Sequence, residues 1–322
     1  MGGPEELLER VRATGLLHSR APVVVLLSGG RDSVCLLDVA VRLAGSDAVS
    51  ALHVNYALRQ ESDGDEQHCR TLCAQLGVEL TAQRAPPPDD AGNLQAWARE
   101  LRHAAGARAA ADRGGLLAVG HTATDQAETI LYRLAASPGR RALLGMAERE
   151  GMLVRPLLRI ARDATTAYCA ARGLTWRDDL SNRDPAYARN RARAQLVPAL
   201  RELHPAAEAN VVRTAELLRE EAAVLDALVE KALAGRNRIA VASLAALPPA
   251  LARLILRRLA EDAAGRLCAR SSGRLEDVLV LGDGALDLGD GARAVVADGV
   301  LRLERTPAGR SAPRDAGAGP AR

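Results

Sequence analysis

Short apolar runs alternate with amphipathic stretches over the first half of the chain. Residues 23–27 are five apolar residues, which is typical of a buried strand in a parallel sheet. Helical spacing of apolar residues, or a charged stretch that stops at glycine, predicts helices between such runs. The expected strands are 23–27, 48–54, 78–84, 116–120 and 152–157, and the expected helices are 5–18, 33–44, 62–77, 94–113 and 125–136. This alternation predicts an α/β fold with a parallel sheet that has helices on both faces.

The pattern changes after about residue 205. Residues 207–234, 243–262 and 273–281 have helical periodicity, whereas residues 285–304 alternate apolar and polar positions around two Asp-Gly turns. This predicts a smaller helical and α+β domain that contains an antiparallel meander. The last residues are poor in apolar side chains, which favours disorder. We therefore expect the main α/β domain at 1–205, a C-terminal domain at 206–305 and a disordered tail at 306–322.

The composition is that of a globular protein with little net charge. Hydrophobic residues make up 48% and charged residues 26% of the 322 positions, and the formal net charge is +3. This charge is too small to establish a nucleic-acid partner, although clustered arginines could still form a basic face. Lys231 is the only lysine. Any phosphate contact would therefore rely on arginine, whose planar guanidinium suits that task.

The cysteines and the apolar runs limit the cofactors and the cellular location. None of the five cysteines forms a C-x-x-C pair, so zinc and iron–sulfur sites are disfavoured and buried, reduced thiols are expected. The N-terminus lacks the layout of a signal peptide, and no apolar run approaches the roughly 18 residues of a membrane span. We expect a cytoplasmic protein without membrane contact.

Polar residues follow three of the predicted strands. Ser28 follows the first strand, His53 lies at the end of the second, and His121 follows the fourth. The carboxyl ends of parallel strands meet along one edge of a sheet, where ligands bind. We therefore expect these residues to line one site.

The segment Ser-Gly-Gly-Arg-Asp-Ser at 28–33 lies between a strand and a helix. Backbone N–H groups at a helix N-terminus are unpaired, and glycines let a phosphate approach closely. The alternative is an ordinary tight turn with a serine or aspartate cap. The strand context and the paired glycines favour a pyrophosphate site, which is neither a Walker loop nor a dinucleotide fingerprint. The predicted contacts are Ser28, Gly29, Gly30, Arg31, Asp32 and Ser33, with Asp32 as an Mg²⁺ ligand.

Other polar residues each have a functional and a plain structural interpretation. His53 could equally be a core histidine, and Arg99 and Arg102 could form a solvated stripe on one helical face. Asp125 and Glu128, near the start of a helix, could hold a metal or polarise a substrate. Equally, they could only complement the helix dipole.

The densest basic cluster of the chain lies in residues 189–193. Arg189 and Arg193 share one face of the expected helix, and Arg191 points elsewhere. Contacts to nucleic-acid phosphates are the functional interpretation, and a solvated basic helix end is the alternative. Arg155, in the short strand expected at 152–157, is a further candidate near the sheet edge. The candidate RNA contacts are therefore Arg155, Arg189, Asn190, Arg191 and Arg193.

As an ordered series, these segments resemble the bacterial tRNA(Ile)-lysidine synthetases, which are PP-loop ATP pyrophosphatases with a Rossmann-like nucleotide-binding fold. The series is S-G-G-x-D-S, H-V-N-x-x-L-R, N-L-x-A-x-A-R-x-x-R, H-x-x-x-D-Q-A-E-T, R-P-L-L and W-x-x-D-x-S-N-x-D-x-x-Y-x-R-N-x-x-R, within about residues 20–200. The resemblance implies ATP, Mg²⁺, L-lysine and the CAU-anticodon tRNA(Ile) as reactants. The wobble cytidine (position 34) would be adenylated at its C2 oxygen with release of pyrophosphate, and lysine would then displace AMP to give lysidine.

The resemblance also implies roles for single residues. Residues 28–33 would hold the pyrophosphate, the C-terminal domain would contact the tRNA, and a homodimer is left open. One of three groups, His121, Asp125 or Glu128, would accept the proton of the lysine amine. The implied sets are His53 and Asn55 for the adenosine, Asp32 and Asp125 for Mg²⁺, and Arg99, Arg102, His121, Asp125 and Glu128 around the reacting atoms.

Two positions depart from the family's pattern, and two other functions stay open. Thr124 stands where the family commonly has an aspartate, which weakens a two-carboxylate metal site, and Tyr56 stands where a histidine is often found.

One alternative is a PP-loop enzyme that thiolates a tRNA base, although the cysteine spacing does not favour it. The other is a nucleotide-binding regulatory module without turnover, to which Thr124 gives some support.

Overall fold

The computed structural model describes residues 3–18, 20–58, 61–87, 94–136, 140–177 and 191–307. The chain divides into two compact units, Met1–Leu218 and Arg219–Arg322. Among the described residues, no helix combines the length and the apolar character that crossing a membrane requires.

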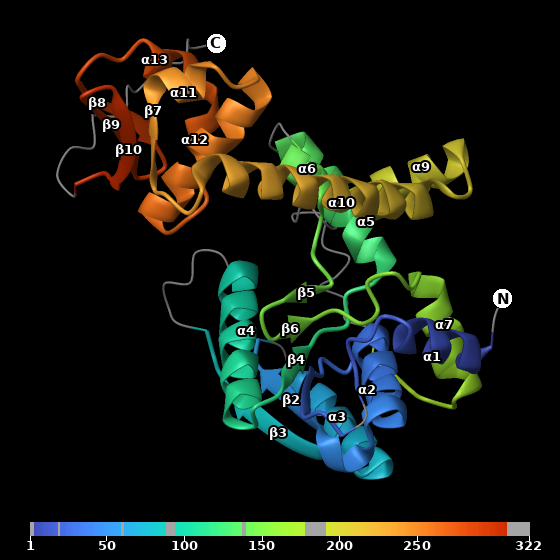
Figure 1. Cartoon of the computed structure of the whole chain (residues 1–322). Coiled ribbons are helices and arrows are strands. Elements are labelled where there is room, and N and C mark those ends of the chain that lie inside the picture. Colours follow the sequence, from blue (N-terminus) through green and yellow to red (C-terminus); the bar gives the residue numbers. More distant parts are fainter. Residues whose placement is uncertain are drawn as a thin grey trace, which may run out of the picture. The chain divides into compact units, whose positions relative to one another are not determined.

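The first unit contains a six-stranded sheet in the order β3-β2-β1-β4-β6-β5 (Figure 1). All neighbouring strands are parallel except β5 and β6. Since β2 lies on one side of β1 and β4 on the other, a crevice for a ligand is expected at the carboxyl ends of β1 and β4. The strands are β1 (Val23–Leu26), β2 (Val49–Asn55), β3 (Glu79–Arg84), β4 (Leu116–Ala118), β5 (Arg149–Glu150) and β6 (Leu153–Val154).

Helices connect these strands and continue beyond them. Helix α10 contains the boundary between the two units. The helices are α1 (Pro4–Arg12), α2 (Arg31–Ala44), α3 (Ser62–Leu76), α4 (Leu94–Asp112), α5 (Ala123–Ala136), α6 (Arg140–Leu143), α7 (Arg162–Ala171), α9 (Val197–Leu203) and α10 (Ala207–Leu233), with a 3-10 turn at Ser46–Ala48 and a π-helical turn at Ala192–Leu196.

The apolar residues of β1 divide between two cores. Val23 and Val25 belong to a core that α1, α2, α3 and α7 complete, and Val24 and Leu26 belong to a second core with residues of α4. Figure 1 shows α2 and α4 on opposite sides of the strands. Successive side chains of a strand point to opposite faces, so a continuous apolar run requires cover on both. The expected parallel sheet with helices on both faces is confirmed.

Several expected elements are shorter or broken. The strand expected at 152–157 ends at Val154, because the chain turns after it: the amide of Leu158 donates to the carbonyl of Arg155 at 3.1 Å. The helix expected at 5–18 ends at Arg12, shortly before Gly15 with a φ of +66°. The antiparallel strand β5 was not predicted, because two residues carry no periodicity.

The second unit combines helices with a four-stranded antiparallel sheet in the order β7-β10-β9-β8. Its last three strands confirm the expected meander. The helix expected at 243–262 is instead two helices, because Pro248 and Pro249 interrupt it and Pro249 begins the second. The elements are β7 (Arg238–Ala240), α11 (Val241–Ala245), α12 (Pro249–Ala264), a 3-10 turn (Ser271–Arg274), α13 (Leu275–Leu279), β8 (Gly284–Gly289), β9 (Ala292–Ala297) and β10 (Val300–Arg305).

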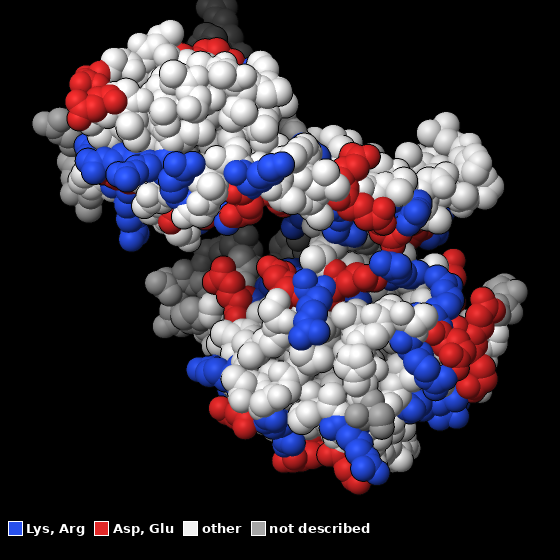
Figure 2. All heavy atoms as spheres, in the orientation of Figure 1, with Lys and Arg blue, Asp and Glu red and all other residues white. Residues whose placement is uncertain are grey.

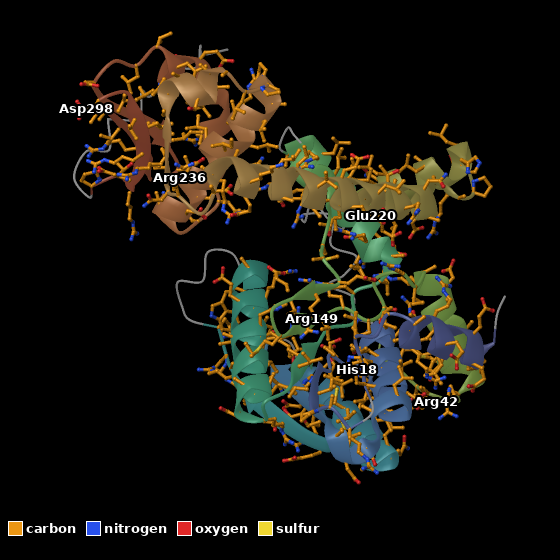
Figure 3. All side chains as sticks on the ribbon, viewed as in Figure 1. His18, Arg42, Arg149, Glu220, Arg236 and Asp298 are labelled. Atoms are coloured by element: carbon orange, nitrogen blue, oxygen red, sulfur yellow. The ribbon has the colours of Figure 1, made fainter. Side chains whose placement is uncertain are left out.

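A buried aspartate connects α2 to α7. Asp38, which is 1% exposed, accepts hydrogen bonds from the Tyr168 hydroxyl at 2.5 Å and from the Arg172 guanidinium at 3.1 and 3.2 Å. One turn later Arg42 (labelled in Figure 3) donates to the Glu5 carboxylate of α1 at 2.6 Å. These contacts fix α7 against the helix that follows β1.

The charged side chains and the thiols differ in where they lie. On the face shown in Figure 2, basic and acidic side chains of the first unit are interspersed. All five cysteines are buried and free, as expected.

We predict that Asp38→Ala lowers the free energy of unfolding by about 2 kcal/mol, because the buried Tyr168 hydroxyl then loses its acceptor. Chemical denaturation measures the change. Asp47→Ala, at an exposed aspartate, is the control and should change stability by less than about 0.5 kcal/mol. Equal effects of the two substitutions would contradict a structural role for Asp38.

Candidate active site

The segment 28–33 forms a tight loop between β1 and α2. The Ser33 hydroxyl donates to the Gly30 carbonyl at 2.8 Å, and the Ser28 amide donates to the Ser33 hydroxyl at 3.2 Å. Gly29 has a φ of +81°, and a Cβ there would lie 3.3 Å from the Cys69 sulfur. Both serines therefore serve the loop itself, and Gly29 needs the conformational freedom of glycine.

The loop leaves backbone donors unused at the start of α2. No hydrogen bond joins the N–H groups of Gly29, Arg31 or Asp32 to any part of the chain that the structure describes. Gly120, after β4, allows the close approach of this segment to the first turn of α2, since a Cβ there would lie 2.9 Å from the Asp32 carbonyl oxygen. Free amides at a helix N-terminus are an anion site, which fits the predicted pyrophosphate contact.

The Asp32 carboxylate faces α7. Its Oδ1 accepts hydrogen bonds from the Thr165 hydroxyl at 2.5 Å and from Arg31 Nε at 3.2 Å. Its Oδ2 lies 3.4 Å from Arg162 Nε. Thr165 and Arg162 both belong to the first turn of α7, so this turn contacts both oxygens of Asp32.

Asp125 has two tasks at the start of α5. Its Oδ2 accepts hydrogen bonds from the amide and the hydroxyl of Thr122, each at 2.8 Å, which caps the helix. Its Oδ1 accepts hydrogen bonds from Arg162 Nη2 at 2.9 Å and Arg193 Nη2 at 3.2 Å. Burial opposes the charge, but Arg162, His121 and the Thr122 hydrogen bonds outweigh it and lower the pKa of Asp125. The cap agrees with the interpretation of Asp125 as a residue at a helix start, and its role toward a metal or a substrate stays a prediction.

Glu128, one turn along α5, is 3% exposed. Arg193 donates to both of its oxygens, from Nε at 2.6 Å and from Nη2 at 3.0 Å. Burial nevertheless raises the pKa of Glu128, and the hydrogen bonds from Arg193 offset this only in part. Arg193, which the sequence proposed as an RNA contact, lies in the π-helical turn at Ala192–Leu196. Its guanidinium forms ion pairs with Glu128 and Asp125.

The charges of Asp125 and of three arginines act on His121. Burial lowers its pKa to about 3, and the charges of Arg155, Arg99 and Arg102 lower it further against the opposing effect of Asp125. Its Nδ1 is buried without a hydrogen-bond partner. His121 is therefore a neutral imidazole at physiological pH. Arg99 and Arg102 of α4 affect the pKa of this same histidine, and their grouping around reacting atoms stays a prediction.

His53 and Asn55, which were predicted to contact the adenosine, hydrogen-bond other parts of the chain. His53 is 5% exposed, and its Nδ1 lies 2.9 Å from the Leu27 carbonyl oxygen. Asn55 donates to Asp63 and Glu66, each at 2.9 Å, and accepts from the amide of Ala57. Both residues lie at the end of β2, and their described polar contacts join it to the end of β1, to α3 and to the loop that follows.

The other predicted RNA contacts differ in position. Arg155 is 4% exposed and donates to the Ala147 carbonyl at 2.6 Å and to Glu150 at 3.2 Å, so it does not face solvent. Arg191 is exposed. Arg189 and Asn190 lie outside the described residues.

The predicted Mg²⁺ ligands, Asp32 and Asp125, contact one guanidinium. Arg162 lies between them, and the same side chain reaches within 3.9 Å of Glu128. Within the described ranges, no three or more histidine, cysteine, aspartate or glutamate side chains are placed to hold a metal ion. Without a further group, the carboxylates therefore do not form a ready-made metal site.

Sequence reasoning missed Arg162, Thr165 and Gln126. Gln126 hydrogen-bonds the backbone of Met146 in both directions, at 2.7 and 2.8 Å, and so fixes the loop before β5. For Arg162 one signal was available: an arginine in the first turn of a helix opposes the helix dipole and requires a nearby anion. The anions lie far away in the sequence, so the signal does not identify them.

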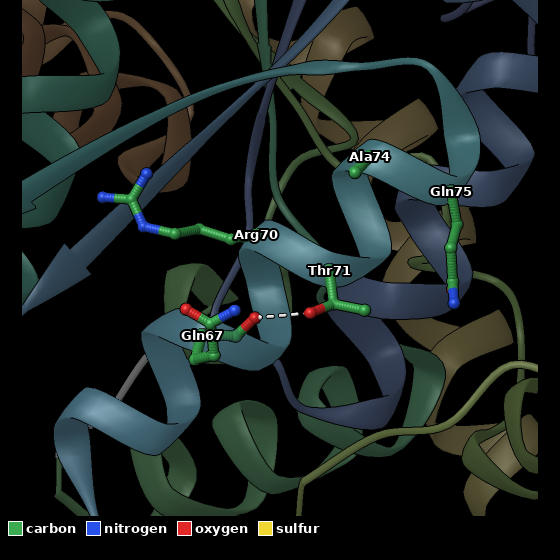
Figure 4. Close-up of a pocket in the computed structure, with 5 residues that line it drawn as sticks. All are labelled: Gln67, Arg70, Thr71, Ala74 and Gln75. Atoms are coloured by element: carbon green, nitrogen blue, oxygen red, sulfur yellow. Dashed lines mark hydrogen bonds between the residues drawn. The ribbon is translucent and has the colours of Figure 1, made fainter.

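A separate depression lies on the outer face of α3 (Figure 4). Its volume is about 500 Å³, and Gln67, Arg70, Thr71, Ala74 and Gln75 line it. All five belong to one helix, and Thr71 donates to the Gln67 carbonyl. Polar groups from several elements do not converge on it, as they do in most ligand sites.

Comparison with known proteins agrees with this geometry. Residues 6–200 match the sequence model of the PP-loop domain. The tRNA(Ile)-lysidine synthase of Thermus thermophilus is 40% identical over 273 residues, which cover 82% of this chain and 53% of that protein. The tRNA(Ile)-lysidine synthase of Hyphomonas neptunium is 39% identical over 272 residues, which cover 79% of this chain and 73% of that protein.

A solved structure supports the fold alone. The U34-tRNA thiolase NcsA from Methanococcus maripaludis with its 4Fe-4S cluster is 18% identical, with a TM-score of 0.56 over 67% of this chain and 78% of that chain. The present chain spans about half the length of most of the curated relatives that it matches, the Thermus enzyme among them. The PP-loop match over more than half of the chain, together with the extended similarity to the Hyphomonas enzyme, shows that the chain belongs to the PP-loop domain family and, within it, to the tRNA(Ile)-lysidine synthases.

Proposed function

We propose that the chain ligates L-lysine to C2 of the wobble cytidine of the CAU-anticodon tRNA(Ile), with ATP as the activating substrate. The observation that carries this proposal is a loop of free amides at the end of β1, next to three carboxylates and two arginines. Relatives at about 40% identity bear the name of this activity. The site therefore has separate groups for a departing pyrophosphate and for proton transfer.

The first step is adenylation of the base. Attack of the cytosine C2 oxygen on the α-phosphate forms a P–O bond and breaks the bond to pyrophosphate. The free N–H groups of Gly29, Arg31 and Asp32 would stabilise the charge that develops on that leaving group. Bound with the nucleotide, Mg²⁺ would neutralise phosphate charge, and Asp32 stays the proposed contact to it only when the nucleotide brings the cation.

The second step is attack of the lysine amine on C2, which expels AMP. The amine must lose a proton, and the structure separates the three candidate bases. His121, with a pKa near 3, is a weak base. The pKa of Asp125 is lowered, which makes this carboxylate a weaker base than an ordinary aspartate. Glu128 has a raised pKa, so we assign the proton transfer to Glu128.

The remaining assignments concern the arginines and Asn190. Arg99 and Arg102 act on the charge around His121, next to the reacting atoms. Arg189, Asn190 and Arg191 remain the proposed RNA contacts, whereas Arg193 and Arg155 act within the site. The contribution of the C-terminal domain to tRNA binding and a homodimer both stay predictions.

The thiolase alternative has less support. Burial raises the pKa of Cys69 to about 12 and that of Cys73 to about 11. Thiols with such pKa values are poor nucleophiles at physiological pH. We therefore retain lysine as the proposed nucleophile.

We predict that Asp32→Asn slows tRNA-dependent pyrophosphate release by on the order of 100-fold, the size typical of losing one electrostatic contact in a transition state. A continuous pyrophosphate assay measures the rate, and thermal unfolding confirms that the variant is folded. Asp47→Asn is the matched control, at an exposed aspartate of the turn after α2. A near-normal rate in Asp32→Asn would remove Asp32 from the mechanism.

We predict that the rate of lysine transfer falls as pH decreases through a pKa above the usual glutamate range, because Glu128 is then protonated and cannot accept a proton. Glu128→Gln should lose this limb of the profile and slow transfer by about 100-fold or more. Single-turnover incorporation of labelled lysine measures both effects.

The control for this profile is Glu148→Gln, which removes a carboxylate that pairs with Arg159 outside the cluster. It should keep the wild-type pH dependence. An unchanged profile in Glu128→Gln would assign the proton transfer to another group.

A further inference from the structure

We propose that Arg162 is an internal counter-ion that takes the place of a divalent cation between Asp32 and Asp125, so that the site without nucleotide excludes free Mg²⁺. The inference rests on the proposed function only in taking Mg²⁺ as the cation that accompanies ATP. It changes the interpretation of the two carboxylates from preformed metal ligands to partners of an arginine.

The position of the guanidinium supports this role. Arg162 Nη2 lies 2.9 Å from Asp125 Oδ1, Nε lies 3.4 Å from Asp32 Oδ2, and Nη1 lies 3.9 Å from Glu128 Oε1. One positive charge thus contacts three carboxylates that come from α2 and α5. Its Nε is buried and has no hydrogen-bond partner, so charge rather than a hydrogen bond relates it to Asp32.

The carboxylates are anchored without Arg162. Thr165 and Arg31 hold Oδ1 of Asp32, and the amide and hydroxyl of Thr122 hold Oδ2 of Asp125. Removing the Arg162 guanidinium would therefore leave Asp32 and Asp125 fixed in place without their shared cation, while Arg193 still donates to Asp125 Oδ1 at 3.2 Å. Like charges at short range repel, and carboxylate oxygens are the ligands that Mg²⁺ and Mn²⁺ prefer. A divalent cation is the natural replacement.

The neighbouring sequence is consistent with one cation at this place. The side chain at position 124 is a threonine that is 4% exposed, and its hydroxyl has no hydrogen-bond partner. No carboxylate is therefore available there to bind a metal beside Arg162. The positive charge of Arg162 also opposes the N-terminal dipole of α7, an arrangement that the nearby carboxylates make tolerable.

The test is a titration with Mn²⁺ alone, followed by electron paramagnetic resonance of the free ion, without nucleotide, lysine or tRNA. The wild-type chain should show no tight site. Arg162→Ala should gain one site per chain, with affinity increased about tenfold or more, because a like charge within about 4 Å of the cation is removed. Adding Asp32→Asn to Arg162→Ala should abolish the gained site.

Three variants make the result specific. Arg159→Ala, three residues earlier and about half exposed, removes an arginine outside the cluster and should leave Mn²⁺ binding unchanged. Arg162→Lys keeps the charge and should stay close to wild type. Arg162→Gln replaces Arg162→Ala if thermal unfolding shows that the alanine variant is not folded.

Two outcomes would overturn the inference. One is a tight Mn²⁺ site in the wild-type chain that Asp32→Asn removes. The other is a folded Arg162→Ala or Arg162→Gln variant that gains no site. Neither outcome depends on lysidine formation, which is assayed separately with ATP, lysine and tRNA, so a failure of the proposed reaction would leave the Mn²⁺ result intact.

Discussion

Guanidinium groups shared among buried and partly buried carboxylates are the interaction on which the site depends. Asp32, Asp125 and Glu128 come from two helices, and Arg162 and Arg193 join them. Taking carboxylates out of water is costly, and unpaired they would separate or become protonated. The two arginines allow the charges to lie close together at the ends of β1 and β4. The planar fork of donors also fixes their relative position, which a lysine could not do in the same way.

The sheet supplies the second constraint. The order of strands reverses at β1, so the loop after β1 and the helix after β4 start next to each other. Gly120 allows that approach, since a Cβ at this position would come within 2.9 Å of the Asp32 carbonyl oxygen. The cluster around Asp38 fixes α7, and with it Arg162, against α2. The packing of helices and strands therefore sets the positions of the charged groups in the site.

Burial and neighbouring charges shift the pKa values of Asp125 and Glu128 in opposite directions. Asp125 lies among more donors, and its pKa is lowered, whereas burial raises the pKa of Glu128 one turn away. His121 stays neutral because burial and nearby arginines both disfavour its charge. Titratable groups pushed apart in this way indicate separate tasks. In the proposed reaction, one carboxylate organises the helix start and another accepts a proton.

What the sequence by itself determined was local. The apolar run before Ser28 predicts a strand covered on both faces, and the glycines of 28–33 predict a phosphate loop, because period and turn chemistry are properties of neighbouring residues. The order of motifs also indicated the family. The sequence placed the start of a helix near Asp125 but could not decide whether this carboxylate contacts a metal or substrate or only complements the helix dipole.

The tertiary structure alone decided which groups meet. It placed Arg162 between Asp32 and Asp125, turned Arg193 toward Glu128, and used His53 and Asn55 inside the fold. These pairs are separated by long stretches of chain, and no periodicity or spacing encodes them. Contact between distant residues depends on how the sheet orders its strands and how closely helices pack on it, which is a property of the folded chain as a whole.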